Sequence, residues 1–169
     1  MPKVIEPKAL GAPLGMYSHG VVVPAGELVV VAGQVGIGPS GTVANDVVAQ
    51  TKQAFANVRA VLEAAGCSFR DVVRLQTFLT RADDIPGFMR AREEVFAEAY
   101  PHAQYPPNTL LVISRLVRPD LLVEIEAMAV RAPRGHARRS GAGSAKRARS
   151  AGTKRSRAVK APARAKRQR

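Results

Sequence analysis

The chain has 169 residues, of which 46% are hydrophobic, and a formal net charge of +13 at pH 7. Fourteen of its 26 lysines and arginines lie in residues 132–169, which contain no acidic residue, so residues 1–131 carry 12 basic against 13 acidic residues. The charge therefore belongs to a C-terminal segment and does not mark the body of the chain as a nucleic-acid-binding domain.

Residues 1–131 have the size of one domain with a modest core, and their composition excludes several classes of site. Cys67 is the only cysteine, which excludes an internal disulfide and a cysteine-cluster zinc site, and we expect it to be an ordinary core or loop residue. His19, His102 and His136 stand far apart, so we expect no metal, and no motif points to a cofactor. Because no signal peptide or membrane span is evident, we expect a cytoplasmic protein without membrane contact.

Two short strands and a long helix are predicted first. The strands are HGVVVP (19–24) and ELVVVAGQVG (27–36), and the turn PAG between them favours a hairpin. The helix should run from about Asn45 to Ala65, with Gly66 at its C-terminal cap. Its apolar face, with residues spaced by three and four, consists of Val48, Thr51, Phe55, Val58, Leu62 and Ala65.

The second half of the body alternates strand and helix again. DVVRLQTFLT (71–80) alternates apolar and polar residues and is predicted to be a strand. A second helix should begin between Asp84 and Pro86, because proline suits a first helical turn. The predicted face of this helix contains Phe88, Arg92, Val95, Phe96 and Ala99. The strands NTLLVISRL (108–116) and LLVEIEAMAV (121–130) complete the order ββαβαββ.

The strands at 27–36 and 108–116 are apolar on both faces, since odd and even positions both carry large aliphatic residues. Two helices can cover only one face of a sheet built from such strands. The other face must be covered by a closed barrel or by other subunits. We therefore predict an obligate oligomer, although the pattern does not give the number of subunits.

Residues 132–169 are predicted to be a disordered tail. They mix Ala, Ser, Gly and Pro with dispersed charge, and no apolar cluster offsets the cost of about 1–2 kcal/mol for fixing each residue. The segment resembles the C-terminal tails of histone H1-like, nucleoid-associated proteins, which predicts weak, salt-sensitive binding to DNA or RNA phosphates. The alternative is a solvated tail without a dedicated partner. The paired basic residues expected to contact phosphates are Arg138, Arg139, Lys146, Arg147, Lys154 and Arg155.

Four ordered blocks of the body, GMYSHG (15–20), AGQVG (32–36), NVRAVLEAAGCSFRDVVRLQTFLT (57–80) and VEIEAMAV (123–130), carry a resemblance to a known family. They resemble the RidA (YjgF, endoribonuclease L-PSP) family of reactive-intermediate deaminases from Leu14 to Val130. The resemblance implies an α+β, chorismate-mutase-like protomer whose mixed sheet is covered on one face by two helices. It also implies a homotrimer with small-molecule clefts between subunits.

The resemblance further implies a chemistry and a set of site residues. Active family members hydrolyse enamine and imine intermediates to a keto acid and ammonia. Glu124, the first glutamate of EIEA, matches the residue that positions or activates water. Tyr17 matches a pocket tyrosine, and Ala32, Gly33 and Gln34 match a backbone stretch that shapes the pocket.

One position departs from the family pattern. PPNT (106–109) stands where the family has PARS, so Asn108 occupies the position of the arginine that holds the substrate carboxylate. An amide can bind a carbonyl, hydroxyl or amide, but it cannot form the charge-assisted bidentate contact of a guanidinium. We therefore expect a small uncharged or differently anchored ligand and little 2-aminoacrylate deaminase activity. Arg115, seven residues on, would lie on the opposite face of a regular strand and is not expected to compensate.

Each candidate also has a structural alternative. Glu124 and Glu126 share one strand face and would also fit an exposed edge, while Tyr17 would also fit a packing role. Asn108 would also fit a local cap, and His19 either lines the pocket or is structural. Three interpretations stay open: a hydrolase of C=N bonds, a non-catalytic small-molecule-binding trimer, and a trimer tethered to nucleic acid by the tail.

Overall fold

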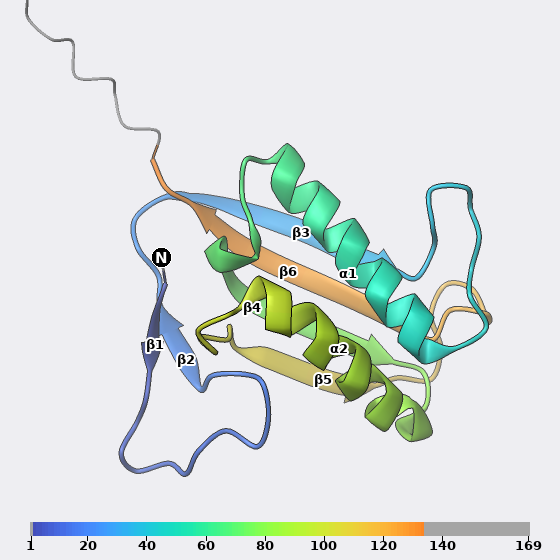
Figure 1. Ribbon diagram of the computed structural model, residues 1–169, viewed down its shortest axis with the longest axis horizontal. Helices are drawn as coiled ribbons and strands as arrows, with labels where there is room; N and C mark the ends of the chain where they lie inside the picture. Colours follow the sequence, from blue (N-terminus) through green and yellow to red (C-terminus); the bar gives the residue numbers. More distant parts are fainter. Residues whose placement is uncertain (1, 134–169) are drawn as a thin grey trace, which may run out of the picture. The chain divides into compact units, whose positions relative to one another are not determined.

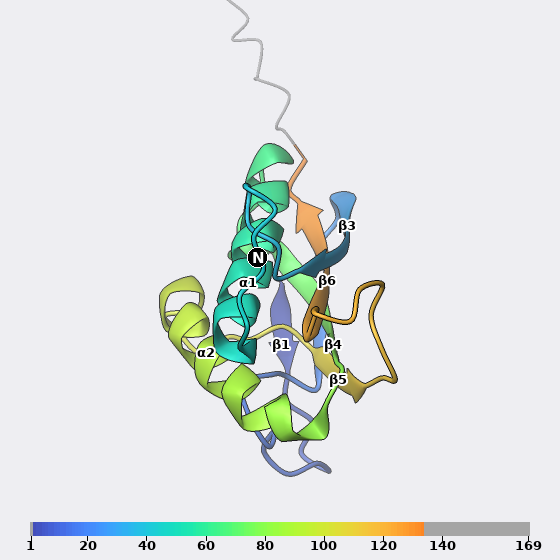
Figure 2. The same cartoon turned by 90° about the vertical axis from the view of Figure 1, so that its right-hand side faces the viewer.

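The computed structural model describes residues 2–133. Four strands form a mixed sheet in the order β3-β6-β4-β5, in which β4 and β5 are parallel and the other pairs are antiparallel. Their bounds are Glu27–Val35 (β3), Val72–Leu79 (β4), Asn108–Val112 (β5) and Val123–Arg131 (β6). The helices α1 (Val47–Ala64) and α2 (Ile85–Ala99) both cover the same face of the sheet (Figures 1 and 2). The predicted α+β protomer is confirmed, and the predicted tail lies, from residue 134 on, outside the described residues.

The bounds of α1 follow from residues at its two ends. The backbone N–H of Ala49 donates to the Asp46 side chain at 2.9 Å, which satisfies one of the free donors of the first turn. At the other end Gly66 has a φ of +74°, a conformation that stops a helix and that glycine adopts without strain. The predicted bounds are therefore correct to within two residues.

The core lies between α1, α2 and the sheet. α2 begins with Pro86 in its first turn, as predicted, and Phe88 and Phe96 of its inner face are at most 1% exposed. Phe55 of α1 lies 5.6 Å from Phe96 between ring centroids, and Tyr100 lies 4.8 Å from Phe96. Burying each such ring contributes about 1.5–3 kcal/mol. None of the helices within residues 2–133 is long and apolar enough to cross a membrane.

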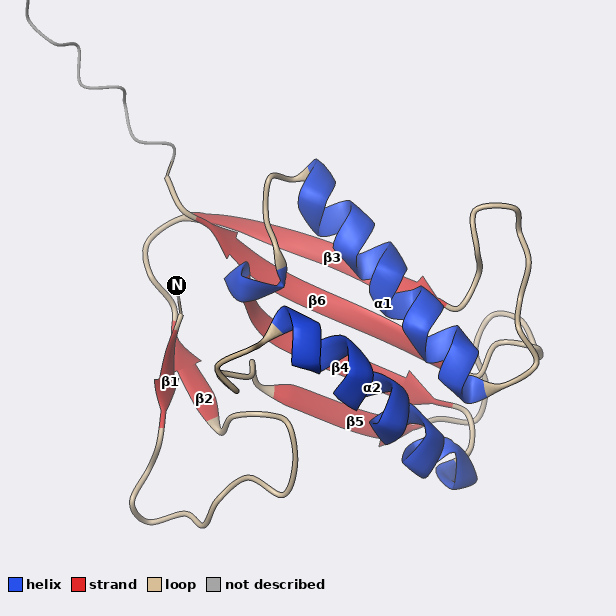
Figure 3. Ribbon diagram, viewed as in Figure 1, coloured by secondary structure: helices blue, strands red, loops and turns tan. Residues whose placement is uncertain are grey.

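The predicted hairpin between the first two strands is wrong. β2 (Gly20–Val22) pairs with β1 (Lys3–Ile5) in a separate two-stranded sheet, and β3 pairs with β6 (Figure 3). At the end of the segment PAG, Gly26 packs against the end of β6, where a Cβ added to it would lie 2.4 Å from the Arg131 carbonyl oxygen. The segment also lacks the Asn-Gly type of dipeptide that favours tight hairpins.

One face of the four-stranded sheet has no helix over it (Figure 2). On β6 the residues facing the helices are buried, and those of the other parity face away from them. Leu28 and Val30 on β3 are 62% and 63% exposed, and Leu111 on β5 is 42% exposed. Aliphatic residues this exposed on one face of a sheet are typical of an interface, and the oligomer stays a prediction.

The last residue of the sheet is tied to two other elements. The Arg131 side chain forms an ion pair with Glu27 of β3 and donates a hydrogen bond to the carbonyl oxygen of Ala65 at 2.9 Å. The end of β6 is thereby fixed to the start of β3 and to the end of α1.

Candidate functional site

Asn108 is the first residue of β5 and lies in register with Leu75 of β4. The two prolines before it have no backbone N–H to donate, which explains why the strand begins at this residue. Thr77 Oγ1 donates to Asn108 Oδ1 at 3.2 Å. Leu75 and Thr77 are buried beneath the helices, so the register places the Asn108 side chain on the helix side of the sheet. With its oxygen bonded to Thr77, the amide NH₂ is the group that can donate to a ligand.

A cavity of about 380 Å³ brings Asn108 together with two other predicted residues, Tyr17 and His19. The rings of Tyr17 and His19 meet edge to face, with 6.2 Å between their centroids. Tyr17 and Asn108 therefore share a cavity, as the family pattern implies. His19 lines it as well.

The same cavity contains a cation that the sequence analysis did not assign. Arg74 lines it beside Asn108, and the Arg74 guanidinium donates to Gln76 Oε1 at 2.5 Å. Both residues lie on the polar side of β4, where the alternation of residues 71–80 places them. The alternating pattern indicates that Arg74 lies on the polar face of the strand, but it does not show which side chains of that face reach a cavity.

Glu124 lies in the middle strand β6, between Val35 of β3 and Phe78 of β4. Its neighbours in sequence, Val123 and Ile125, are fully buried under the helices. Because successive residues of a strand point to opposite faces, the Glu124 side chain points to the uncovered face. It is half-buried there.

Gly33 leaves the space that the Glu124 carboxylate occupies. The register between β3 and β6 shifts between Val31 and Gln34, which includes Ala32 and Gly33 in a bulge. A Cβ added at Gly33 would lie 1.6 Å from Glu124 Oε1, so a side chain there would displace the carboxylate. Gln34 resumes the pairing, opposite Ile125, and its side-chain NH₂ donates to the Ala32 carbonyl at 3.1 Å. The predicted backbone stretch at 32–34 thus borders Glu124.

The environment of Glu124 favours its protonated form. Partial burial raises the pKa of the Glu124 carboxyl, and the neighbouring carboxylate of Glu126 raises this pKa further. A carboxyl with a raised pKa can accept and return a proton closer to neutral pH than an ordinary glutamate.

Replacing Glu124 by glutamine should make the fold slightly more stable at pH 7. Because the folded-state pKa is raised, the contribution of the wild-type carboxyl to stability is fully present below its ordinary pKa of 4.5 and is lost as the pH rises through the folded value. Thermal unfolding of Glu124→Gln and wild type should therefore differ at pH 7 and converge near pH 4. Glu93→Gln, at an exposed position of α2, is the control. A wild type more stable than Glu124→Gln at pH 7 would contradict the effect of burial.

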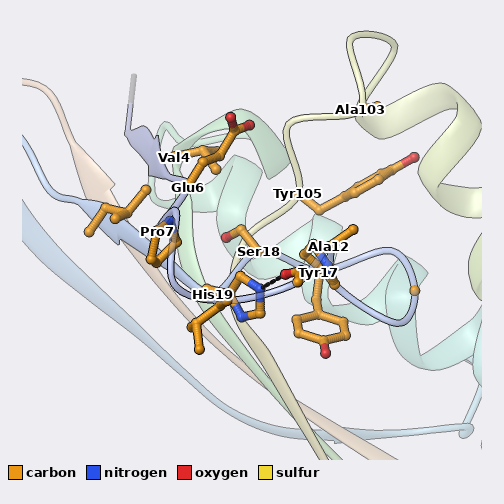
Figure 4. A pocket seen from close by; sticks show the side chains of 14 residues that line it. Val4, Glu6, Pro7, Ala12, Tyr17, Ser18, His19, Ala103 and Tyr105 are labelled. Carbon is orange, nitrogen blue, oxygen red and sulfur yellow. Dashed lines mark hydrogen bonds between the residues drawn. The ribbon is translucent and has the colours of Figure 1, made fainter.

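A second cavity of about 410 Å³ lies at the N-terminal loop (Figure 4). Tyr17, Ser18 and His19 line both cavities, so these three residues separate the two spaces. One ring nitrogen of His19, Nε2, lies 2.8 Å from the Gly11 carbonyl oxygen within this second cavity. The loop that holds Tyr17 is therefore held in place by its own histidine.

The structure does not unite all predicted site residues within one protomer. Glu124 points to the uncovered face of the sheet, whereas Asn108 points to the helix side. Arg115 does not lie on a strand face at all, because β5 ends at Val112, and its Nε donates to the Leu116 carbonyl. Cys67 is a core residue whose thiol pKa is raised by burial, so it is not an activated nucleophile.

Comparison with known proteins yields one consistent group. The family model described as Endoribonuclease L-PSP matches residues 7–131. The chain is 36% identical over 132 residues to a 2-iminobutanoate/2-iminopropanoate deaminase of Salmonella typhimurium, an alignment that covers 78% of this chain and 99% of that protein. It is 34% identical over 132 residues, with the same coverage, to the protein of that name in Escherichia coli.

Solved structures give the same result for the fold. A Rid-family protein of unknown function from Yersinia pestis, YyfB, superposes with a TM-score of 0.68 at 32% identity, covering 76% of this chain and 98% of that one. Escherichia coli TdcF with bound serine superposes with a TM-score of 0.59 at 32% identity, covering 77% of this chain and 99% of that one.

Proposed function

Because this chain belongs to the endoribonuclease L-PSP (RidA, YjgF) family, we propose that it hydrolyses small imines or enamines in clefts between the subunits of a homotrimer. The observation that carries this proposal is the Glu124 carboxylate, seated against Gly33 on the uncovered sheet face. The named activity of the Salmonella typhimurium relative is deamination of 2-imino acids. A cytoplasmic location is part of the same proposal.

The proposed reaction needs little from the protein. An enamine first takes up a proton on carbon and loses one from nitrogen, which makes it an imine. Water then adds across the C=N bond: its oxygen bonds to carbon and one of its protons passes to nitrogen, which gives a carbinolamine. The carbinolamine hydroxyl then gives its proton to nitrogen as the C–N bond breaks, which releases ammonia and leaves a carbonyl. Glu124 would accept the proton of the attacking water and return it to the departing nitrogen, a task that suits a carboxyl with a raised pKa.

The trimer is supported by the positions of the site residues as well as by the exposed aliphatic face. Asn108 and Glu124 point to opposite faces of one protomer's sheet, so we propose that the cleft combines Asn108 of one protomer with Glu124 of another. Leu28 and Val30 lie on the same uncovered face as Glu124 and would be buried by such an assembly.

Asn108 is proposed to shift the substrate range away from amino-acid-derived acids. Its NH₂ group offers a neutral donor where a guanidinium would offer a charge-assisted pair. Arg74 is the cation in this cavity, but it is exposed and already bonded to Gln76, and contacts of an exposed charge are worth about 0–1 kcal/mol. The preferred ligand is therefore a small imine without a carboxylate.

The proposal is tested with two substrates generated in situ. An amine oxidase acting on a small primary amine supplies an uncharged imine, and a serine dehydratase supplies 2-aminoacrylate. We expect ammonia release from the uncharged imine to be faster with the protein and to return to the background rate with Glu124→Gln, while 2-aminoacrylate decays at its uncatalysed rate. Accelerated loss of 2-aminoacrylate that disappears in Arg74→Gln would contradict our interpretation of Asn108 and identify Arg74 as the anchor.

A non-catalytic binding protein is the second candidate, and the departure at Asn108 favours it. A trimer that has lost the carboxylate anchor can retain its clefts for a ligand that is held and released unchanged. Saturable binding of small amides or ketones, with no acceleration of either imine reaction, would support this candidate over the hydrolase.

We also propose that residues 132–169 bind DNA or RNA through their 14 basic residues. In a trimer about three such segments would act together, so that weak phosphate contacts add through a high effective concentration. This contact would place the protein at the nucleoid without any role for the clefts. A solvated segment without a partner is the alternative.

Truncation after Pro133 should abolish DNA binding at low salt and leave the oligomer unchanged. For the full chain, affinity for a DNA duplex should fall steeply with salt, because phosphate contacts release counterions. Gel-shift titration between 50 and 200 mM salt measures DNA binding and its salt dependence. Analytical ultracentrifugation measures the oligomeric state. A truncated chain that binds DNA as tightly as the full chain would show that the contact lies in the body.

A further inference from the structure

Arg92 is a buried cation in the middle of α2. Its side chain faces the core, as its place on the apolar face of the helix predicts, and the residue is only 4% exposed. The guanidinium carbon lies 5.5 Å from the centre of the Phe88 ring and 5.7 Å from that of Phe96. Burial lowers the pKa of Arg92, which reflects the cost of holding this charge away from water.

No counter-charge accompanies Arg92 within residues 2–133. Four other arginines of this range form ion pairs with a carboxylate: Arg59, Arg81, Arg118 and Arg131. Arg92 forms neither an ion pair nor a side-chain hydrogen bond with the described residues, and its Nε is buried without an acceptor. The two rings give part of the missing stabilisation, but they provide no acceptor for the guanidinium hydrogens.

The guanidinium lies behind the wall of the larger cavity. One of its terminal nitrogens would be 3.5 Å from a Cβ added at Gly15, and Gly15 lines the 410 Å³ cavity. Tyr105, another lining residue, is the group that acts electrostatically on Arg92. The hydroxyl of Ser18, which also lines the cavity, is buried without a hydrogen-bond partner (Figure 4). An unpaired hydroxyl therefore lies in the wall of this space, and the unpaired guanidinium lies outside the lining, next to Gly15, which has no side chain.

The remaining walls define the ligand. Most of them are aliphatic or proline side chains: Val4, Ile5, Pro7, Leu10, Ala12 and Pro13. One guanidinium can neutralise one negative charge, and the Glu6 carboxylate in the lining would repel a second one. A monoanion with a short hydrocarbon body satisfies Arg92 and fills the apolar volume, whereas a strongly hydrated dianion such as phosphate does neither.

We propose that the cavity between the N-terminal loop and Tyr105 binds a short-chain aliphatic carboxylate, with Arg92 as the cation that pairs with it. This site is separate from the cavity of Asn108, and the two share only the wall formed by Tyr17, Ser18 and His19. The inference goes beyond the proposed hydrolysis and holds whether or not the protein turns over an imine.

The test is calorimetric titration of the full chain with butyrate, and with inorganic phosphate in a second series. Arg92→Met removes the charge and retains length and apolar packing. Gly15→Ala is the second variant: the backbone there has no positive φ and the added carbon would make only ordinary contact, yet the methyl covers the outer guanidinium nitrogen. Arg90→Met, at an exposed position of the same helix, is the matched control, and it carries the same basic C-terminal segment as the others.

We expect saturable binding of butyrate at millimolar concentration or below, at least tenfold weaker in Arg92→Met, weaker in Gly15→Ala and unchanged in Arg90→Met. Phosphate should bind all four proteins equally. Absence of saturable butyrate binding to the wild type, or equal binding by all variants, would overturn the proposal, as would phosphate binding that depends on Arg92. If Arg92→Met does not fold, the comparison of Gly15→Ala with Arg90→Met decides between the same outcomes.

Discussion

Replacing Asn108 by arginine should raise the rate of 2-aminoacrylate hydrolysis at least tenfold over the wild-type chain. A hydrogen bond to a charged group contributes about 1.5–3 kcal/mol, and each 1.4 kcal/mol corresponds to a factor of ten. Asn108 already lines the 380 Å³ cavity with Tyr17 and His19, so the new guanidinium would enter a space that can hold a small acid. The measurement is the decay of 2-aminoacrylate generated by a serine dehydratase.

The same substitution carries a cost that must be separated from the gain. Thr77 Oγ1 donates to Asn108 Oδ1, and arginine offers no acceptor, so a buried hydroxyl would lose its partner at about 1–3 kcal/mol. The double variant Thr77→Val/Asn108→Arg should recover this stability and keep the activity. Asn108→Gln, which retains an amide without charge, should stay inactive. If arginine brings no activity in either background, the cleft has diverged from that substrate at other positions too.

Replacing Gly33 by alanine should remove hydrolysis as completely as replacing Glu124 by glutamine. The added Cβ would lie 1.6 Å from Glu124 Oε1 and 2.5 Å from its Cδ, so the whole carboxylate must move to another rotamer. Loss of a positioned acid–base group lowers rates by about 10²–10⁴-fold. Forcing the side chains apart should also destabilise the fold by about 1–3 kcal/mol. Imine turnover and urea unfolding measure the two effects.

The cause can be isolated by a double-mutant cycle. In a Glu124→Ala background the added methyl meets no carboxylate, so Gly33→Ala should there cost little stability. Gly20→Ala is the control, because it also lies in a strand and a Cβ there meets its nearest neighbour at 3.5 Å. A Gly33→Ala chain with full activity would mean that the position of Glu124 against β3 is irrelevant to catalysis.

Periodic and local signals predicted most of the protomer correctly. The apolar face of α1 and the glycine after it determined that helix to within two residues, and Pro86 located the start of α2. The strands at 71–80 and 121–130 were recognisable because one parity is consistently apolar. These features depend on neighbours within one element, which is why a single sequence contains them.

The pairing of the first strands was mispredicted because it depends on distant contacts. β2 pairs with β1, and β3 pairs instead with β6, where Glu27 meets Arg131 at a separation of 104 residues in sequence. The extent of β5 was overestimated for a similar reason. Its apolar pattern continues to residue 116, but the strand ends at Val112, so the parity argument about Arg115 did not apply.

The candidate site was predictable in its residues and not in its geometry. The motifs identified Glu124, Gly33, Tyr17 and Asn108, and the structure groups them into two pairs on different faces of the sheet. Arg74 and Arg92 were missed as possible ligand groups. Nothing in the sequence around Arg92 indicates that it lacks a carboxylate partner. That property depends on how α2, the loop at Gly15 and the segment at Tyr105 pack together.

The contacts of Arg131 have a consequence for how such a protein can evolve. Its bonds to Glu27 and Ala65 fasten the end of β6 through contacts made within residues 2–133. We therefore expect mutations that lengthen, shorten or delete the basic extension to leave the folding of the body unchanged. Under this expectation the extension and the body can change independently in evolution, and lineages with and without the extension can retain the same body.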